Sequence, residues 1–179
     1  MKFIAKISAK FTVAMLLSLS SMQAMAADLK ISDPAPTFTV TDNAGKDFSL
    51  DSRKGKWTVL YFYPKAGTPG CTKQACGFRD GIKKIRELGA EVYGISSDTV
   101  ADQAKFHEAQ HLNFSLLADP DSKVIDQYGS KMMGMKMSKR WTFIIDPTLT
   151  IRDIERDVDP VLDASKVAAK IADLQKTAK

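Results

Sequence analysis

The sequence has few of the residues that build metal centres and disulfide frameworks. Its 179 residues include only two cysteines, Cys71 and Cys76, and two histidines, His107 and His111. A structural zinc site needs about four such ligands, and no histidine lies close in sequence to the cysteine pair. The C-x4-C spacing also differs from the C-x2-C spacing of local zinc motifs. A zinc-stabilised fold is therefore disfavoured.

The two histidines do match one catalytic metal motif. The segment "HEAQH" has the H-E-x-x-H pattern of zinc metalloproteases, and we expect it on a helix over residues 100–111, capped by Asp98 or Thr99. Both histidines would then share one helical face. A catalytic zinc needs a third protein ligand, and the chain has no third histidine. We therefore favour an exposed helix face that carries two histidines by chance.

Repeats, low-complexity segments, linkers and long runs of like charge are also absent from the sequence. The formal charge is +5, but three lysines lie in residues 1–26, so the rest of the chain carries +2. The other lysines and the acidic residues are interspersed, as on an ordinary solvated surface. The composition therefore gives no indication of nucleic-acid binding.

Residues 1–26 have the pattern of a secretory signal peptide. A basic start, an apolar run and a small-x-small cleavage site follow one another: Lys2, Lys6 and Lys10, then residues 11–19, then Ala24-Met25-Ala26. The apolar run is well short of the ~20 residues that span a bilayer, and no cysteine near the cut could carry a lipid. We expect a mature chain that begins at Ala27, forms one domain over residues 27–179, resides in the periplasm and has no membrane attachment.

Hydrophobic periodicity predicts strands that alternate with helices along the mature chain. We expect strands within residues 57–64, 91–97, 114–119 and 141–158, the last a hairpin turning at Asp146-Pro147, and helices over residues 71–88, 100–111, 122–129 and 164–174. An N-terminal hairpin is expected in residues 36–50. This order predicts an α/β fold with a central mixed β-sheet flanked by helices, of the thioredoxin-like kind.

Both cysteines lie in the stretch "YPKAGTPGCTKQACGFRD", which begins at Tyr63. In an exported protein, two cysteines form a disulfide by default. A regular helix separates the Cα atoms of residues i and i+5 by roughly 8–9 Å, which exceeds the ~7 Å that a disulfide bridges. The short loop between the cysteines would also remove little chain entropy. A structural disulfide is disfavoured, because it can form only if the helix unwinds locally.

A reactive thiol suits the same stretch better. Pro69 is typical of a first helical turn, where its missing N–H costs nothing, so Cys71 is predicted at a helix N-terminus. Free backbone N–H groups and the helix dipole favour a thiolate there. The preceding strand carries this turn to the carboxyl end of the sheet, where open α/β folds place their sites. Cys76 is expected on the other side of the helix, more deeply buried, and able to condense with a sulfenic acid on Cys71.

The stretch resembles the peroxidatic motif of peroxiredoxins, in particular the peroxiredoxin Q, or bacterioferritin comigratory protein, subfamily. The family core Pro-x3-Thr-x2-Cys is matched by Pro64, Thr68 and Cys71, and the subfamily's resolving cysteine by Cys76. The segments "PAPTFTV", "FSLLAD" and "RWTFIID" resemble family segments in the expected order, so the likeness covers nearly the whole mature chain. The subfamily often has Glu three residues after the reactive cysteine, where this chain has Gln74.

The resemblance implies a thiol peroxidase that reduces hydrogen peroxide or organic hydroperoxides. Cys71 would attack the peroxide, Cys76 would resolve the product, and Pro64 would shape the pocket. Thr68 and the family arginine, matched by Arg140 in "RWTFIID", would hold the two peroxide oxygens. A thioredoxin-like dithiol would reduce the resulting disulfide. No metal or organic cofactor is implied, and a monomer is expected.

Two other functions stay open. A periplasmic thiol–disulfide oxidoreductase of the cytochrome-maturation kind is one, although that chemistry normally uses C-x-x-C. A non-enzymatic copper-binding module is the other, because the loop "KMMGMKMSKR" offers the thioethers of Met132, Met133, Met135 and Met137 to copper(I). For these methionines we favour the packing of irregular gaps over copper binding or sacrificial oxidation.

Overall fold

A computed structural model of the chain describes residues 28–177. The expected signal peptide, residues 1–26, lies outside this part of the chain. Within residues 28–177, no helix combines the length and the apolar character that a membrane span requires.

A five-stranded mixed sheet forms the centre of the fold, in the order β5-β4-β3-β6-β7. Its strands are β3 (Trp57–Phe62), β4 (Ala90–Ser96), β5 (Leu116–Ala118), β6 (Trp141–Ile145) and β7 (Ile151–Glu155). The first three of these are parallel, whereas β6 runs antiparallel to β3, and β7 antiparallel to β6. A separate hairpin of β1 (Thr39–Thr41) and β2 (Asp47–Ser49) precedes the sheet.

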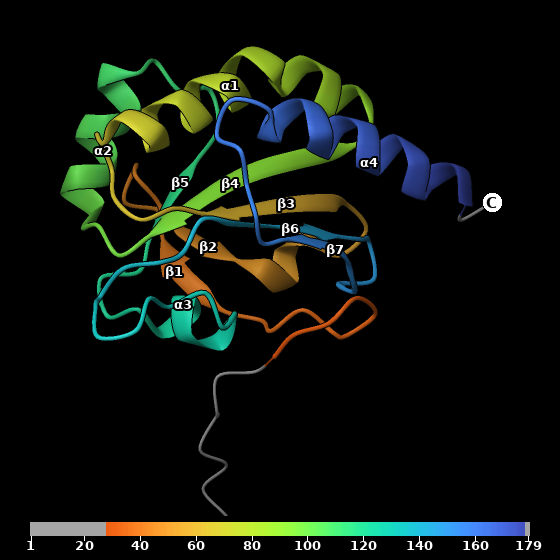
Figure 1. Cartoon of the computed structure of the whole chain (residues 1–179), viewed down its shortest axis with the longest axis horizontal. Coiled ribbons are helices and arrows are strands. Elements are labelled where there is room, and N and C mark those ends of the chain that lie inside the picture. Colours follow the sequence, from red (N-terminus) through yellow and green to blue (C-terminus); the bar gives the residue numbers. More distant parts are fainter. Residues whose placement is uncertain (1–27, 178–179) are drawn as a thin grey trace, which may run out of the picture.

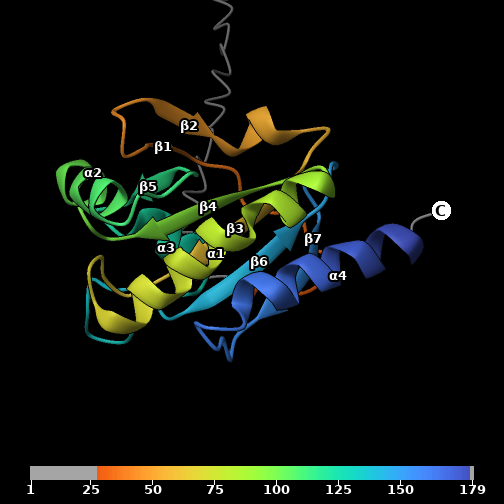
Figure 2. The same cartoon turned by 90° about the horizontal axis from the view of Figure 1, so that it is seen from above.

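Both faces of the sheet are covered (Figure 1). α1 (Pro69–Glu87) and α4 (Asp163–Thr177) lie side by side across one face, as Figure 2 shows from above. α2 (Val100–Ala109) packs on the same side through Phe106. The hairpin, a short 3-10 helix (Leu50–Arg53) that the sequence did not predict, and α3 (Lys123–Gln127) cover the other face. The predicted thioredoxin-like α/β fold with an N-terminal hairpin is confirmed.

The central strand β3 is apolar on both sides because both sides are buried. Val59 and Tyr61 point into the core under α1 and α4, and Leu60 and Phe62 point into the opposite core. This explains the near-continuous apolar run that predicted a central strand. Gly94 of β4 makes room for the Tyr61 ring, since a Cβ at Gly94 would lie 2.6 Å from Tyr61 Cζ.

The predicted elements are present, with shifted ends. α1 begins at Pro69, two residues earlier than expected, with Thr68 as its N-cap residue. Thr99 caps α2, as one of the two expected candidates, by accepting a hydrogen bond from the Asp102 backbone N–H. α4 extends to Thr177, beyond the predicted end at residue 174.

The prediction that α2 reaches His111 was wrong, and with it the shared face of the two histidines. α2 ends at Ala109, and His111 has a left-handed φ of 49°. The N–H of Leu112 bonds the His107 carbonyl, and the N–H of His111 bonds that of Glu108. This is a Schellman C-cap, which satisfies the last carbonyls and turns the chain away from the helix axis. Among residues 28–177, no three His, Cys, Asp or Glu side chains are grouped closely enough to hold a metal ion.

Candidate active site

Cys71 is the third residue of α1 and lies just beyond the carboxyl end of β3. Its side chain is 1% exposed. The N–H of Thr72 bonds back to the Thr68 carbonyl at 2.9 Å, so the N–H groups of Gly70 and Cys71 precede the helical ladder. These groups and the positive end of the helix dipole attract negative charge to the turn that carries the sulfur.

Arg140 lies directly before β6 and reaches the Cys71 sulfur. Its Nη2 donates to Cys71 Sγ over 3.4 Å. The sheet register produces this meeting, because Trp141 at the start of β6 pairs with Phe62 at the end of β3. Gly70 permits it, since a Cβ at that position would lie 3.2 Å from Arg140 Nη2. The structure thus places the arginine expected from the resemblance beside the expected cysteine.

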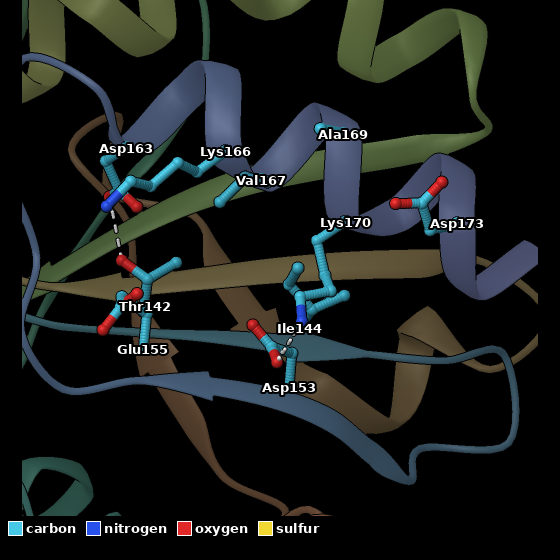
Figure 3. A pocket seen from close by; sticks show the side chains of 10 residues that line it. All are labelled: Thr142, Ile144, Asp153, Glu155, Asp163, Lys166, Val167, Ala169, Lys170 and Asp173. Carbon is cyan, nitrogen blue, oxygen red and sulfur yellow. Dashed lines mark hydrogen bonds and ion pairs between the residues drawn. The ribbon is translucent and has the colours of Figure 1, made fainter.

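A buried chain of hydrogen bonds continues from Arg140 away from the sulfur. Arg140 Nη1 donates to Gln74 Oε1 at 2.6 Å, and Gln74 Nε2 donates to Asp163 Oδ2 at 2.7 Å. The Thr142 hydroxyl donates to the same carboxylate oxygen at 2.8 Å (Figure 3). Gln74 and Asp163 are 1% and 2% exposed. Burial raises the pKa of Asp163, and the hydrogen bonds from Gln74 and Thr142 partly oppose this rise.

Pro64 and Thr68 bound the loop that leads from β3 into Cys71. The Thr68 hydroxyl donates to the Lys65 carbonyl at 3.0 Å and leaves its lone pairs available as acceptors. The Ala66 N–H donates to the Asp98 carboxylate, beyond the end of β4, at 2.8 Å. The loop is therefore fastened to the neighbouring strand before the chain enters α1.

A second buried network fixes the same end of the sheet to α2. The Tyr63 hydroxyl donates to Gln103 Oε1, and Gln103 Nε2 donates to the Ser96 hydroxyl at 2.7 Å. Ser96 donates in turn to Asp98 at 2.7 Å. Burial raises the pKa of Tyr63 far above its usual value, against the lowering effect of the bonds to Ser96 and Gln103. Tyr63 therefore stays a neutral donor that holds this network together.

Cys76 faces the C-terminal end of α2, away from Arg140. Its Sγ lies 3.7 Å from Gln110 Oε1. Cys76 is half-buried whereas Cys71 is fully buried, so the expectation that Cys76 is the deeper cysteine was wrong. The reason is that Cys71 belongs to the buried core cluster of Tyr61, Tyr63 and Phe78, and Arg140 contacts its sulfur. The two sulfurs are not bonded to each other, and regular helix geometry separates their Cα atoms by about 8–9 Å.

The methionine loop, residues 131–138, leads toward Arg140 and is closed by a hydrogen bond from the Met132 N–H to the Met137 carbonyl. Met133 is 96% exposed and Met135 51% exposed, so the expectation that they pack into gaps was wrong. The tight turn carries both side chains at its exposed tip. The copper(I) hypothesis stays a prediction, which copper binding that survives loss of both cysteines would support.

The comparisons with known proteins agree with this geometry. The model of the AhpC/TSA family matches residues 31–154, which include both cysteines and Arg140. The chain belongs to the AhpC/TSA family. It is 39% identical over 146 residues to a bcp peroxiredoxin of Coxiella burnetii, across 82% of this chain and 96% of that protein.

Solved structures give the same result. Peroxidoxin BcpB from Mycobacterium tuberculosis is similar with a TM-score of 0.76 and 36% identity, over 82% of this chain and 98% of that one. The bacterioferritin comigratory protein of Xanthomonas campestris is similar with a TM-score of 0.72 and 26% identity, over 76% and 91%. The peroxiredoxin Q resemblance is confirmed, and the protein is an enzyme of the thiol peroxidase class.

Sequence reasoning missed the residues that hold this site together. Gln74 was noted only as a departure from the subfamily pattern. Asp163 lies 89 positions beyond Gln74 and has no local signal. Asp98 was considered as a helix cap, but its carboxylate instead fastens the loop ahead of Cys71.

Proposed function

We propose that the protein reduces hydrogen peroxide and organic hydroperoxides, with Cys71 as the attacking thiolate and Cys76 as the resolving thiol. The observation that carries the proposal is the position of Cys71 at the N-terminal turn of α1, with Arg140 on its sulfur. A helix N-terminus and a guanidinium are the two groups that most directly favour a thiolate. Membership of a thiol peroxidase family supports the same chemistry.

The reaction balances with the residues at hand and one external dithiol. The Cys71 thiolate attacks one peroxide oxygen, so an S–O bond forms, the O–O bond breaks, and the leaving oxygen takes a proton and departs as water or alcohol. Sulfur is thereby oxidised to a sulfenic acid. The Cys76 thiol attacks that sulfur, an S–S bond forms, and water leaves. The dithiol then reduces the disulfide and is itself oxidised to a disulfide.

In this proposal Arg140 and Thr68 hold the peroxide, and Pro64 shapes the approach. Arg140 Nη2 donates to the sulfur, at the place where charge shifts from sulfur to the leaving oxygen during the attack. The Thr68 hydroxyl donates to the Lys65 carbonyl, so its lone pairs can accept a hydrogen bond from the peroxide. Thr68→Val should therefore lose most of the peroxidase rate, and a variant with full activity would remove Thr68 from the mechanism.

The burial of Cys71 supports a small oxidant over a protein disulfide. A side chain that is 1% exposed can be reached by a peroxide group, but a folded protein disulfide cannot approach it without rearrangement. This argues against the thiol–disulfide oxidoreductase alternative. Organic hydroperoxides are included because the structure of the Xanthomonas campestris relative concerns its alkyl peroxide reduction activity.

Resolution by Cys76 needs the first turns of α1 to open, because the helical separation exceeds what a disulfide bridges. Both cysteines belong to one helix, so the proposed cycle needs no second chain, and we propose a monomer. The opened disulfide would be accessible to a thioredoxin-like dithiol. Size-exclusion chromatography with light scattering in both redox states tests the monomer.

We also propose export to the periplasm, supported by the signal-like pattern of residues 1–26. Intact-mass measurement of protein from the native host should give a chain that begins at Ala27. A chain that keeps Met1 and fractionates with membranes would contradict this location.

The central experiment is stopped-flow oxidation of the reduced protein by hydrogen peroxide and by several organic hydroperoxides. Fluorescence of Trp141, the neighbour of Arg140, gives a signal close to the site. We expect rapid second-order oxidation in the parent protein and in Cys76→Ser, and none in Cys71→Ser. A parent protein that reacts no faster than a free thiol would contradict the proposed function.

A further inference from the structure

The buried hydrogen-bond chain behind the sulfur ends at a residue outside the recognised motif. We propose that Asp163, acting through Gln74, positions the guanidinium of Arg140 on the Cys71 sulfur. Asp163 touches neither sulfur nor substrate, so its role is positioning. The inference rests on the proposed function, because it concerns how the same thiol is prepared for reaction.

The donors and acceptors of this chain allow one arrangement. The Arg140 guanidinium can only donate hydrogen bonds, so the amide oxygen of Gln74 must face Arg140. The amide nitrogen must then point toward Asp163, whose carboxylate oxygen accepts it at 2.7 Å. Because both ends are fixed in polarity, Asp163 prevents Gln74 from turning its amide over. The Gln74 oxygen is thereby held at the place that Arg140 needs.

Asp163 also joins the two elements that supply the reacting pair. Through Gln74 it bonds α1, which carries Cys71, and through Thr142 it bonds β6, which follows Arg140 directly. One carboxylate oxygen accepts both bonds. A single side chain of α4 therefore sets the distance between the helix of the cysteine and the strand of the arginine.

The start of α4 is held firmly against α1, so Asp163 is a fixed anchor. Two glycines of α1 on the Gln74 side of the helix, Gly77 and Gly81, face the start of α4 and the residues before it. A Cβ at Gly81 would lie 3.4 Å from Ala164 Cβ, and one at Gly77 would lie 3.9 Å from the Pro160 carbonyl oxygen. These are ordinary packing distances, so α1 and the start of α4 are in contact directly beside the bond between Gln74 and Asp163.

Asp163 also lines a pocket that is open to solvent. The pocket has a volume of about 300 Å³ and is also lined by Glu155 and Lys166, which Figure 3 shows between α4 and the sheet. A shorter side chain at residue 163 would let water from the pocket reach Gln74. Water can donate or accept, so it would no longer fix the orientation of the Gln74 amide.

The proposal can be tested by exchanging the carboxylate and the amide between residues 163 and 74 of the hydrogen-bond chain. The parent protein has one carboxylate, on Asp163, and one guanidinium, on Arg140. Gln74→Glu would place a second carboxylate at hydrogen-bond distance from the first in a buried site, where two like charges are strongly unfavourable. Adding Asp163→Asn removes the conflict, because the new amide on α4 can donate to the new carboxylate on α1. The double variant keeps one carboxylate, with the charge moved from α4 to α1. The Thr142 hydroxyl, which donates to Asp163 in the parent protein, then accepts a hydrogen bond from the new amide nitrogen.

The experiment compares four proteins that all carry Cys76→Ser: the parent, Gln74→Glu, Asp163→Asn and the double variant. Two rates are measured on each: oxidation by hydrogen peroxide, and alkylation of Cys71 by iodoacetamide at neutral pH. We expect Gln74→Glu to lower both rates by at least about tenfold in the parent background, and by less than about threefold in the Asp163→Asn background. Asp173→Asn, an exposed acidic residue of the same helix, is the matched control and should change neither rate.

An equal loss from Gln74→Glu in both backgrounds would overturn the proposal. Circular dichroism and thermal melting separate folding from positioning. One outcome is that Gln74→Glu folds only in the presence of Asp163→Asn. In that case, the coupling between residues 74 and 163 is supported if the double variant also recovers the alkylation rate of the parent protein. Failure of Gln74→Glu to fold in either background counts against it. If alkylation shows the coupling but no protein reacts with peroxide, the positioning role holds and the proposed function fails.

Discussion

The two cysteines of α1 lie in opposite kinds of surroundings. Cys71 is buried and contacts Arg140, which a hydrogen-bond chain ties to the start of α4. Cys76, further along the same helix, is half-buried, and its sulfur makes a long contact of 3.7 Å with Gln110. Cys71 lies on α1, contacts Arg140 ahead of β6, and is linked through Arg140 and Gln74 to α4. Cys76 is held mainly by its own helix.

This difference matches the two tasks proposed for the pair. Attack on a peroxide is faster when the sulfur and the guanidinium are already held at a fixed distance and orientation. Reorganisation of these groups during the reaction would raise the activation free energy. Resolution needs the opposite, since Cys76 must leave its place to reach Cys71. The helix therefore combines a tightly fastened reactive residue with a loosely fastened partner.

The largest expected effect comes from removing each sulfur in turn. Cys71→Ser should abolish peroxide consumption, because no other cysteine lies at the helix terminus with an arginine beside it. Cys76→Ser should keep the first oxidation and lose turnover with a dithiol. Peroxide consumption with and without dithiol distinguishes the two. Turnover that survives Cys71→Ser would reverse the assignment.

Arg140→Lys should weaken the fixed side of the comparison. A lysine keeps the charge but cannot contact Cys71 and Gln74 at once, as the two guanidinium nitrogens do. We expect the second-order rate with hydrogen peroxide to fall by about 10²-fold, the usual size of losing one oriented donor. Arg152→Lys, whose arginine pairs with Asp146 away from the site, is the control. Equal rates in both variants would show that charge alone suffices.

Hydrogen exchange across residues 68–80 tests whether the helix around Cys76 opens when the disulfide forms. A disulfide between Cys71 and Cys76 requires the helix to open, which breaks backbone hydrogen bonds worth about 0.5–1.5 kcal/mol each. We expect faster exchange in the oxidised protein than in the reduced one, despite the added covalent bond. Slower exchange after oxidation, with a lower melting temperature on reduction, would instead indicate a structural disulfide.

The smallest expected effect is a pH dependence of stability. Burial raises the pKa of Asp163 above the 3.8 of an unperturbed aspartate, so the folded protein binds this proton more readily than the unfolded chain. Its stabilising contribution is fully present below the unfolded pKa and is lost as pH rises through the folded pKa. We expect the free energy of unfolding of the parent protein, relative to that of Asp163→Asn, to increase as the pH falls from about 7 to about 3. Urea unfolding of both proteins over this range measures the difference. The opposite trend would contradict the raised pKa.

The sequence predicted the parts of the site that depend on local chemistry. Pro69 marked the helix start, and periodicity gave the strand that leads to it. Arg140 was identified from family resemblance, because spacing could not select it over Arg79 or Arg152. In the structure Arg79 bonds its neighbour Asp80, and Arg152 pairs with Asp146.

Other features could not be read from the sequence because distant segments determine them. Asp163 looks like the acidic residue that often begins a helix, and only the packing of α4 on α1 turns it toward Gln74. The relative depth of the cysteines was misjudged for the same reason. Cys71 is buried in a core cluster that includes Tyr61 and Phe78, and its sulfur is contacted by Arg140, 69 positions further along the chain.

The packing of α1 on the start of α4 also limits how far α1 can unwind. Behind Cys76, the helix is pressed against the start of α4, and ahead of Cys71, the Ala66 N–H is bound by Asp98. An opening that respects both attachments is confined to residues 67–76. The oxidised segment would then be a short loop, closed by the disulfide and anchored at both ends. The sheet and the remaining helices would keep their places. In the proposed cycle, the external dithiol would meet the disulfide in this opened segment and not in the regular helix of the reduced protein.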